Sequence, residues 1–248
     1  MLPLRDNVPT SRTPYVTYVF IAANILVYFF WQKGGFSLNG PDSTAYLCQL
    51  NEWAAIPAEF SGDKQPLPTE CGTDDAPTYA TLFTAMFMHG GLLHLGGNML
   101  FLWIFGNNVE DAMGPVKFVV FYLMGGIAAF ALQFVTDTAS VIPTVGASGA
   151  IAGVLGGYLL LYPRAKVVTV IFIVFFFTIL ELPALLVLGF WFLQQALMGY
   201  FDLADPTGGG GGVAYFAHIG GFVWGLLAIR LFASKQRTKR PPERLYTR

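Results

Sequence analysis

The chain has 248 residues, of which 54% are hydrophobic and only 12% carry a charge. With a mean hydropathy of +0.55, this composition is typical of polytopic membrane proteins and excludes an ordinary soluble globular domain. Two cysteines are too few for a disulfide-rich scaffold or a thiolate metal cluster. The net charge of -1 says little by itself, because the charges are segregated along the chain.

Apolar segments of membrane-spanning length recur along the chain. They follow a polar and basic start at residues 1–13, and we expect them over residues 14–31, 92–108, 118–135, 148–162 and 213–232. The longer apolar run 167–199 exceeds one crossing but is too short for two. Pro183 divides this run, because proline disfavours helix at the residue before it. We therefore expect a crossing over 182–199, preceded by a segment, 167–177, that lies at or re-enters the inner face.

These segments predict an all-α fold, a polytopic membrane bundle of six transmembrane helices within residues 14–233. The bundle carries a long external loop, 33–85, and is followed by a basic tail, 234–248. With both termini in the cytoplasm, twelve of the 14 basic residues lie inside and only Lys33 and Lys64 lie outside. We expect a multi-pass protein of a prokaryotic cell membrane, whose first span is retained rather than cleaved as a signal peptide.

Four polar side chains occur near the outer ends of these spans. Ser148 begins one span, His218 lies five residues into the last, and both His94 and Asn98 occupy the first turns of the second. At 1.5 Å per residue, His218 lies roughly 7–8 Å below the start of its span. Polar groups inside a membrane are costly and by default mark function. The four side chains are therefore candidates for one site in the outer third of the membrane.

Small residues accompany the serine and the last histidine. Gly149 belongs to a stripe of small residues after Ser148, and Gly221 and Gly225 share a helical face with His218. Small residues let membrane helices approach closely, which would bring the imidazole within reach of the hydroxyl. A serine nucleophile needs such a base, and the oxyanion of its tetrahedral intermediate needs hydrogen-bond donors.

Three motifs carry these residues. They are His-Gly-Gly-Leu-Leu-His-Leu-Gly-Gly-Asn at 89–98, Gly-Ala-Ser-Gly at 146–149, and Ala-His-Ile-Gly-Gly at 217–221. Together and in this order, they resemble the motifs of the rhomboid family of intramembrane serine proteases. The resemblance covers roughly residues 14–233.

The resemblance implies a catalytic dyad with no carboxylate, in which Ser148 is the nucleophile and His218 is the general base. It also implies that the side chains of Asn98 and His94 form the oxyanion hole, where the backbone N–H of Ser148 is a further candidate donor. We expect His89 to hold down the loop before the second span. The residues expected to support the site structurally are His89, Gly146, Gly149 and Gly221.

The activity that follows from this resemblance is that of a serine endopeptidase acting on transmembrane protein substrates near the outer face. The partners are then those substrates and the lipid bilayer, with no nucleic acid, no cofactor and no metal. The oligomeric state is left open. Two alternatives belong to other classes, namely a non-catalytic rhomboid-like protein that binds membrane clients and a metal-binding transporter that uses the three histidines.

The long external loop holds two further features. Many rhomboid proteins have a Trp-Arg pair there, whereas Ala54 follows Trp53 in this chain. Cys48 and Cys71 both lie in this loop, on the side where disulfides persist. We expect them to form a disulfide, and the rival interpretation is two unpaired thiols.

Overall fold

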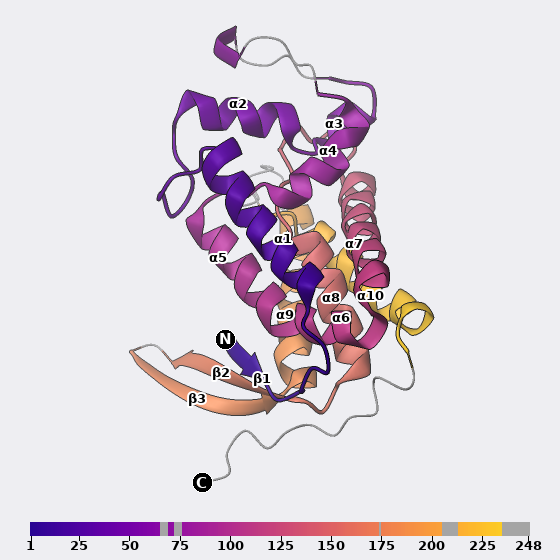
Figure 1. The fold of residues 1–248 in the computed structure, drawn as a ribbon. Helices are drawn as coiled ribbons and strands as arrows, with labels where there is room; N and C mark the ends of the chain where they lie inside the picture. The colour runs from indigo at the N-terminus through magenta and orange to yellow at the C-terminus, as the bar shows by residue number, and fades with distance from the viewer. Residues whose placement is uncertain (65–68, 72–75, 174, 205–212, 235–248) are drawn as a thin grey trace.

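The computed structural model describes residues 1–64, 69–71, 76–173, 175–204 and 213–234, and most of them are helical (Figure 1). In chain order, the α-helices are α1 (Tyr15–Leu26), α2 (Thr44–Trp53), α3 (Pro57–Phe60), α4 (Thr78–Thr84), α5 (Leu92–Phe101), α6 (Asn107–Met113), α7 (Pro115–Thr136), α8 (Ser148–Leu161), α9 (Ala184–Ala204) and α10 (Tyr215–Phe232). Short π-helical segments extend α1, as η1 (Val27–Trp31), and join α5 to α6, as η4 (Leu102–Gly106). Two 3-10 turns, η2 (Thr69–Cys71) and η3 (Ala85–Phe87), lie before and after α4.

Three of the helices, α7, α9 and α10, are long and apolar enough to cross a membrane. Shorter apolar helices, Tyr15–Trp31 and Ser148–Leu161, lie where two other spans were expected. The helical stretch from α5 through η4 into α6 covers the expected span 92–108. The chain is thus a mostly helical membrane protein, and the number of six crossings stays a prediction.

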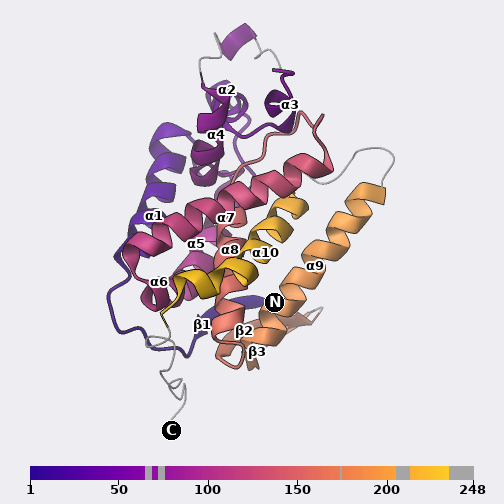
Figure 2. The same ribbon diagram turned by 90° about the vertical axis from the view of Figure 1, so that its right-hand side faces the viewer.

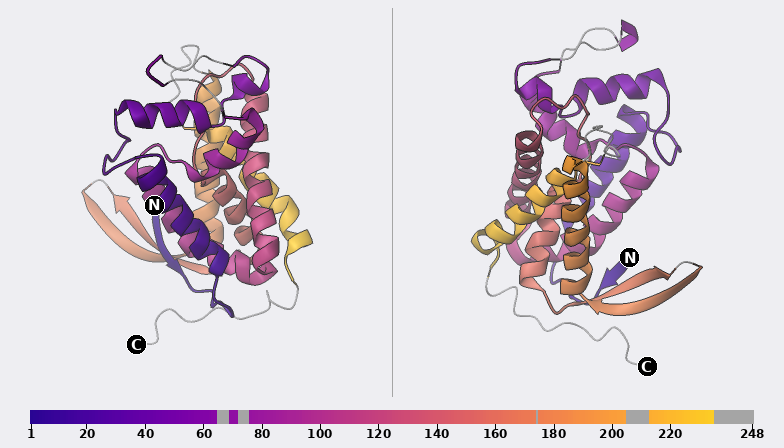
Figure 3. Two further views of the ribbon diagram at one scale, coloured as in Figure 1. Left: turned by 45° about the horizontal axis from the view of Figure 1, so that its top comes forward. Right: turned by 180° about the vertical axis from the view of Figure 1, so that it is seen from behind.

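The all-α prediction is wrong in one region, where three antiparallel strands form a small sheet. Strand β2 (Lys166–Ile173) pairs along its whole length with β3 (Phe176–Pro183), and β1 (Leu2–Asp6) pairs with the first half of β2. β-Branched and aromatic residues dominate the hairpin and favour strands. The periodicity of such an apolar run does not distinguish a strand from a buried helix. Figures 1 and 3 show the sheet at the opposite end of the bundle from α2 and α3.

Helix α10 packs against both α7 and α8, as Figure 2 shows. Glycines bring the backbones of α8 and α10 into direct contact. A Cβ atom on Gly221 would overlap the carbonyl oxygen of Gly149, and one on Gly225 would overlap that of Gly153. The small-residue stripes of these two helices therefore form one continuous seam, the α8–α10 seam.

A buried carboxylate fixes the start of α1. Glu110 of α6 accepts hydrogen bonds from the backbone N–H of Val16 at 3.0 Å and of Thr17 at 2.8 Å, and from the Thr17 hydroxyl at 2.8 Å. The first N–H groups of a helix have no partner within it, so this side chain caps the helix from a distant part of the chain. It ties α1 to the end of the α5–α6 stretch.

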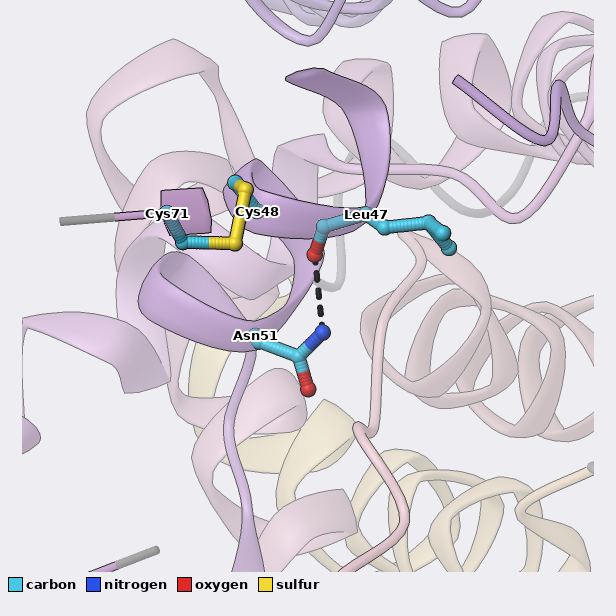
Figure 4. Close-up of a disulfide and its surroundings, with 4 residues drawn as sticks. All are labelled: Leu47, Cys48, Asn51 and Cys71. Carbon is cyan, nitrogen blue, oxygen red and sulfur yellow. Dashed lines mark hydrogen bonds between the residues drawn. A yellow bond between two sulfur atoms is a disulfide. The ribbon is translucent and has the colours of Figure 1, made fainter. Parts of the chain in front are cut away.

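The loop 33–85, which we expect to be external, is folded rather than extended, and it contains α2, α3 and α4. Cys48 of α2 and Cys71 of η2 are joined by a disulfide, 23 positions apart in the sequence (Figure 4). In the same part of α2, the side chain of Asn51 donates to the carbonyl of Leu47 at 2.8 Å (Figure 4). The residue after Trp53, Ala54, is fully buried.

Candidate active site

The loop before Ser148 is pinned by backbone hydrogen bonds. Thr144 exchanges two with Ala55 of the external loop, at 2.9 and 3.2 Å, and the N–H of Gly146 donates to the carbonyl of Ala85 at 2.9 Å. Gly146 has a φ of +124°, and a Cβ there would lie 2.8 Å from two ring atoms of His94. This position therefore requires glycine, both for its backbone conformation and for the close approach of the imidazole.

Ser148 and His218 lie side by side across the α8–α10 seam. The serine Oγ is 2.8 Å from Nε2 of the imidazole, although 70 positions separate the two residues. The serine is the first residue of α8, and the histidine lies in the first turn of α10. The contact has the geometry that a general base needs to remove a proton from a hydroxyl.

The second ring nitrogen of His218 contacts a residue that the sequence analysis missed. Its Nδ1 lies 2.8 Å from Oε1 of Gln195 on α9. The indole of Trp191, one turn earlier on α9, lies against the imidazole with ring centroids 5.7 Å apart. The histidine is therefore held from α9 as well as from its own helix.

His94 carries a hydrogen-bond donor beside the loop that leads to the serine. Its Nδ1 accepts a hydrogen bond from the N–H of Gly90 at 3.2 Å. A neutral imidazole that accepts at Nδ1 carries its proton on Nε2. This second nitrogen is one of the two ring atoms that approach Gly146, next to the start of α8.

Asn98 lies one helical turn after His94 on α5 and is buried. Its side-chain Nδ2 is also buried and has no hydrogen-bond partner among the residues that the structure describes. Both residues line a cavity of about 660 Å³ together with Ser148 and His218. The cavity walls include residues of α5, α8, α9 and α10, so an unused donor, a serine and a histidine face the same cavity.

His89 is fully buried in the loop before α5 and packs edge-on against the ring of His94, with centroids 5.2 Å apart. Burial, and then the neighbouring His94, lower the pKa of His89 to about 3, so its ring is neutral. The loop is held through the backbone of His89. Its N–H donates to Gln32 at 2.9 Å, and its carbonyl accepts from Gln32 at 2.8 Å and from Tyr46 at 3.0 Å.

The two supporting glycines near the dyad meet different neighbours. A side chain at Gly221 would enter the backbone of α8 at Gly149. A Cβ on Gly149 itself would instead lie 2.6 Å from the Cβ of Ala129 on α7, and 3.8 Å from the carbonyl oxygen of Ala217 on α10. The expectation that both glycines set the distance between α8 and α10 therefore applies to Gly221, whereas Gly149 mainly permits the approach of α7.

Three glutamines escaped the sequence analysis although each is tied to a site segment. Gln195 contacts the His218 ring, Gln32 holds the His89 backbone, and Gln133 of α7 accepts from the N–H of Ala217 at 3.2 Å. The available signal was a polar residue within or beside an apolar span. That signal does not say which distant partner the amide meets.

No group of three or more His, Cys, Asp or Glu side chains suited to a metal ion occurs among the residues that the structure describes. The three histidines, which the transporter alternative requires, are all within that part of the chain. Two of their rings pack against each other, and the third contacts Ser148 and Gln195.

The chain is similar to known proteins over most of this helical region. A family model described as the rhomboid domain matches residues 76–235. Rhomboid protein 1, mitochondrial, of Saccharomyces cerevisiae is 33% identical over 167 residues, which are 64% of this chain and 44% of the yeast protein. Rhomboid protease GluP of Bacillus subtilis is 34% identical over 146 residues, 59% of this chain and 24% of that protein.

A third relative is the presenilin-associated rhomboid-like protein, mitochondrial, of Mus musculus, which is 31% identical over 99 residues. That match covers 39% of this chain and 26% of the mouse protein. The chain thus spans less than half the length of each of these relatives. The family model, however, covers well over half of the chain and includes His89, His94, Asn98, Ser148 and His218. The resemblance seen in the sequence is confirmed, and the chain belongs to the rhomboid family.

Proposed function

We propose that this protein is an intramembrane serine endopeptidase that hydrolyses peptide bonds of transmembrane protein substrates. The observation that carries the proposal is the 2.8 Å contact between Ser148 Oγ and His218 Nε2 at the wall of a 660 Å³ cavity. A cavity of this size holds a short extended peptide segment. Membership of a family that includes the protease GluP adds support.

In the proposed reaction, His218 takes the hydroxyl proton of Ser148 while Oγ attacks the carbonyl carbon of the substrate. The tetrahedral intermediate collapses as His218 returns the proton to the leaving amine, and an acyl-enzyme remains. A water molecule, deprotonated by the same imidazole, then releases the acid and restores the serine. The step needs no carboxylate in contact with His218, because a neutral histidine is a sufficient base near neutral pH.

The oxyanion of each intermediate requires donors placed before the reaction begins. The buried, unpartnered Nδ2 of Asn98 and the Nε2–H of His94 are suited to this role, since both residues line the cavity beside Ser148. The backbone N–H of Ser148, at the start of α8, is a third donor. Helix N-termini favour negative charge, which adds to the stabilisation.

The proposal includes a six-span topology, with residues 14–233 in the membrane domain, residues 1–13 and 234–248 in the cytoplasm, and the external loop outside a prokaryotic cell membrane. Helix α8 has 14 residues, about 21 Å at 1.5 Å per residue. A hydrocarbon core is about 30 Å thick, so a helix this short would begin below the membrane surface. Water then reaches Ser148 through the cavity, and a substrate helix enters sideways and unwinds locally.

The decisive experiment is cleavage of a single-span substrate by the purified protein reconstituted in liposomes. Wild type and the exposed-serine control Ser43→Ala are expected to cleave, whereas Ser148→Ala and His218→Ala are expected to show no turnover. A fluorophosphonate probe is expected to label wild type and the control but not Ser148→Ala.

Two outcomes would reject parts of the proposal. Equal cleavage by His218→Ala and wild type would remove the histidine from the mechanism. A folded wild type that neither cleaves nor reacts with the probe, but retains a bound membrane protein, would favour the non-catalytic alternative. A reporter fused after Gly199 tests the topology, and a cytoplasmic signal there would reject the six-span arrangement.

A further inference from the structure

We propose that Gln195 is a positioning residue that fixes the tautomer and the orientation of His218. The proposal rests on the dyad proposed above and adds a third member to it. Gln195 lies on α9, is only 7% exposed, and reaches the imidazole of α10 from the side opposite Ser148. No carboxylate contacts His218 among the described residues.

The chemistry of the contact determines where the imidazole proton sits. Oε1 of Gln195 is an amide oxygen, which accepts hydrogen bonds but has none to donate. At 2.8 Å from this oxygen, Nδ1 of His218 must therefore carry the proton. The lone pair of a neutral ring then lies on Nε2, which faces Ser148 Oγ at 2.8 Å. This is the tautomer that a base for the serine hydroxyl requires.

Helix α9 contacts the imidazole through two residues. Trp191 packs against the imidazole one turn before Gln195, so the same helix contacts the ring through an indole and through an amide. In a buried site, a neutral amide orients the histidine without the desolvation cost of a buried carboxylate. Gln195 thus gives α9 a direct effect on the base, although α9 carries no reacting group.

Three variants in the full-length, reconstituted protein test this role. Gln195→Met keeps the length of the side chain but loses the acceptor, and kcat is expected to fall about tenfold with KM unchanged, as for one neutral hydrogen bond. Gln195→Glu keeps an acceptor oxygen in either protonation state and is expected to retain most of the activity. The adjacent, exposed Gln194→Met is the matched control and is expected to behave as wild type.

A second measurement does not depend on turnover. Because the chain has three histidines, ¹⁵N NMR of histidine-labelled protein can assign His218 by comparison with His218→Ala. Wild type and Gln195→Glu are expected to show a single Nδ1–H tautomer, and Gln195→Met a mixture of two. An unchanged tautomer and an unchanged kcat in Gln195→Met would overturn the positioning role. An inactive wild type with the expected tautomer shift would instead reject the protease proposal alone.

We also infer, from a separate part of the molecule, that the β2–β3 hairpin inserts its tip into the lipid interface at the inner face. Phe175, Phe176 and Phe177 at the tip are 92%, 79% and 68% exposed. No charged residue occurs from 167 to 180. The base of the hairpin, in contrast, carries an ion pair between Lys166 and Glu181 at 3.3 Å. An apolar tip with a charged base matches the change from acyl chains to head groups.

Lipid is the occupant that the neighbouring surface favours. β3 leads directly into α9, whose exposed residues near the hairpin, Leu185, Leu186 and Phe190, continue the apolar surface of a helix long enough to cross the membrane. The hairpin extends sideways from the bundle rather than along it (Figures 1 and 3). Since β3 is an edge strand, it is excluded from the hydrocarbon core, where an open sheet edge has no partner. The lipid interface accommodates both the apolar tip and the open strand edge, because water reaches the edge there.

Spin labels on the full-length protein in liposomes test this placement. Labels are introduced by Phe176→Cys at the tip and by Ser43→Cys in the external loop, while the native cysteines are held in their disulfide. The tip label is expected to collide more often with oxygen than with a water-soluble nickel complex, and the control label the reverse. Nickel accessibility at the tip equal to the control would overturn the proposal. Spin–spin broadening that grows with protein density would assign the surface to a second copy of the chain instead.

Discussion

The helices around the cavity meet in two different ways. Along the α8–α10 seam, glycines bring backbone against backbone, and a Cβ at Gly221 or Gly225 would overlap a carbonyl oxygen of α8. Between α5 and α9, side chains such as Phe101 and Trp191 border a cavity instead, and a Cβ on Gly97 of α5, which also lines it, would meet no atom of the described residues within 4 Å. Close backbone contact is thus concentrated beside the serine and histidine of the proposed dyad, and space lies on the side where the proposed substrate would bind.

Among changes that leave Ser148 and His218 in place, the largest effect is expected for Asn98, which lines the cavity. Asn98→Ala removes the buried Nδ2 that has no partner in the structure. If this group binds the oxyanion, kcat falls on the order of a hundred- to a thousandfold, because one donor is lost in the transition state. Stability should change little, since Nδ2 makes no hydrogen bond with the described residues.

The measurement for Asn98→Ala is kcat in liposomes together with the thermal midpoint. Gly96→Ala is the matched control on the same helix, because a Cβ at that glycine would meet no atom within 4 Å. A thermal midpoint that falls as far as kcat does would reassign Asn98 to packing.

The next largest effect is expected for a substitution in the α8–α10 seam. Gly221→Ala forces α8 and α10 apart, and a misplacement of about 1 Å between serine and base costs on the order of a hundredfold in kcat. Overpacking also lowers the free energy of unfolding by about 1–3 kcal/mol. Gly189→Ala on α9, where a Cβ would meet no atom of the described residues within 4 Å, should leave both quantities close to wild type. Equal tolerance of the two substitutions would show that the α8–α10 seam does not require glycine at position 221.

The sequence predicts the α8–α10 seam better than it predicts the contacts that hold the His218 ring. Small residues at helical spacing, such as Gly221 and Gly225, repeat along a span and show which face packs. The motif at 146–149 and the pair His94 and Asn98 are local patterns as well. They identify candidate residues without knowledge of any distant contact.

The remaining features depend on pairings between distant segments. Gln195 acts on His218 from another helix, 23 positions away, and nothing near it in the sequence shows which of two adjacent glutamines faces inward. The hairpin was missed for a different reason. Residues 167–180 are apolar on every face, so their pattern has neither the period of a helix nor that of a half-buried strand.

The disulfide tests how far the external loop supports the site. The Cys48→Ser, Cys71→Ser double variant should destabilise the folded loop by roughly 3 kcal/mol in the chain-entropy model. Turnover at low temperature should fall less than tenfold, because the loop meets the serine segment through backbone pairing at Ala55, which the variant keeps. Limited proteolysis of intact liposomes, with and without reductant, measures the change. Identical digestion of wild type in both conditions would show that the bond does not stabilise the loop.

The smallest effect is expected at the end of the α8–α10 seam remote from Ser148, where Asp6 of β1 contacts Tyr158 of α8. Its Oδ2 accepts hydrogen bonds from the hydroxyl of Tyr158 at 2.5 Å and from Asn108 at 2.7 Å. Burial raises the pKa of Asp6 from 3.8 to about 6, although the Tyr158 hydrogen bond opposes the rise. The folded protein therefore binds this proton more tightly than the unfolded chain. The stability that the protonated group contributes is complete below about pH 4 and is lost as the pH rises through about 6. Asp6→Asn lacks this titration, so wild type should lose thermal stability relative to the variant between pH 4 and 7, with turnover little affected. A difference in thermal midpoint that stays constant over this range would show that Asp6 does not titrate there and that β1 holds α8 equally well at every pH.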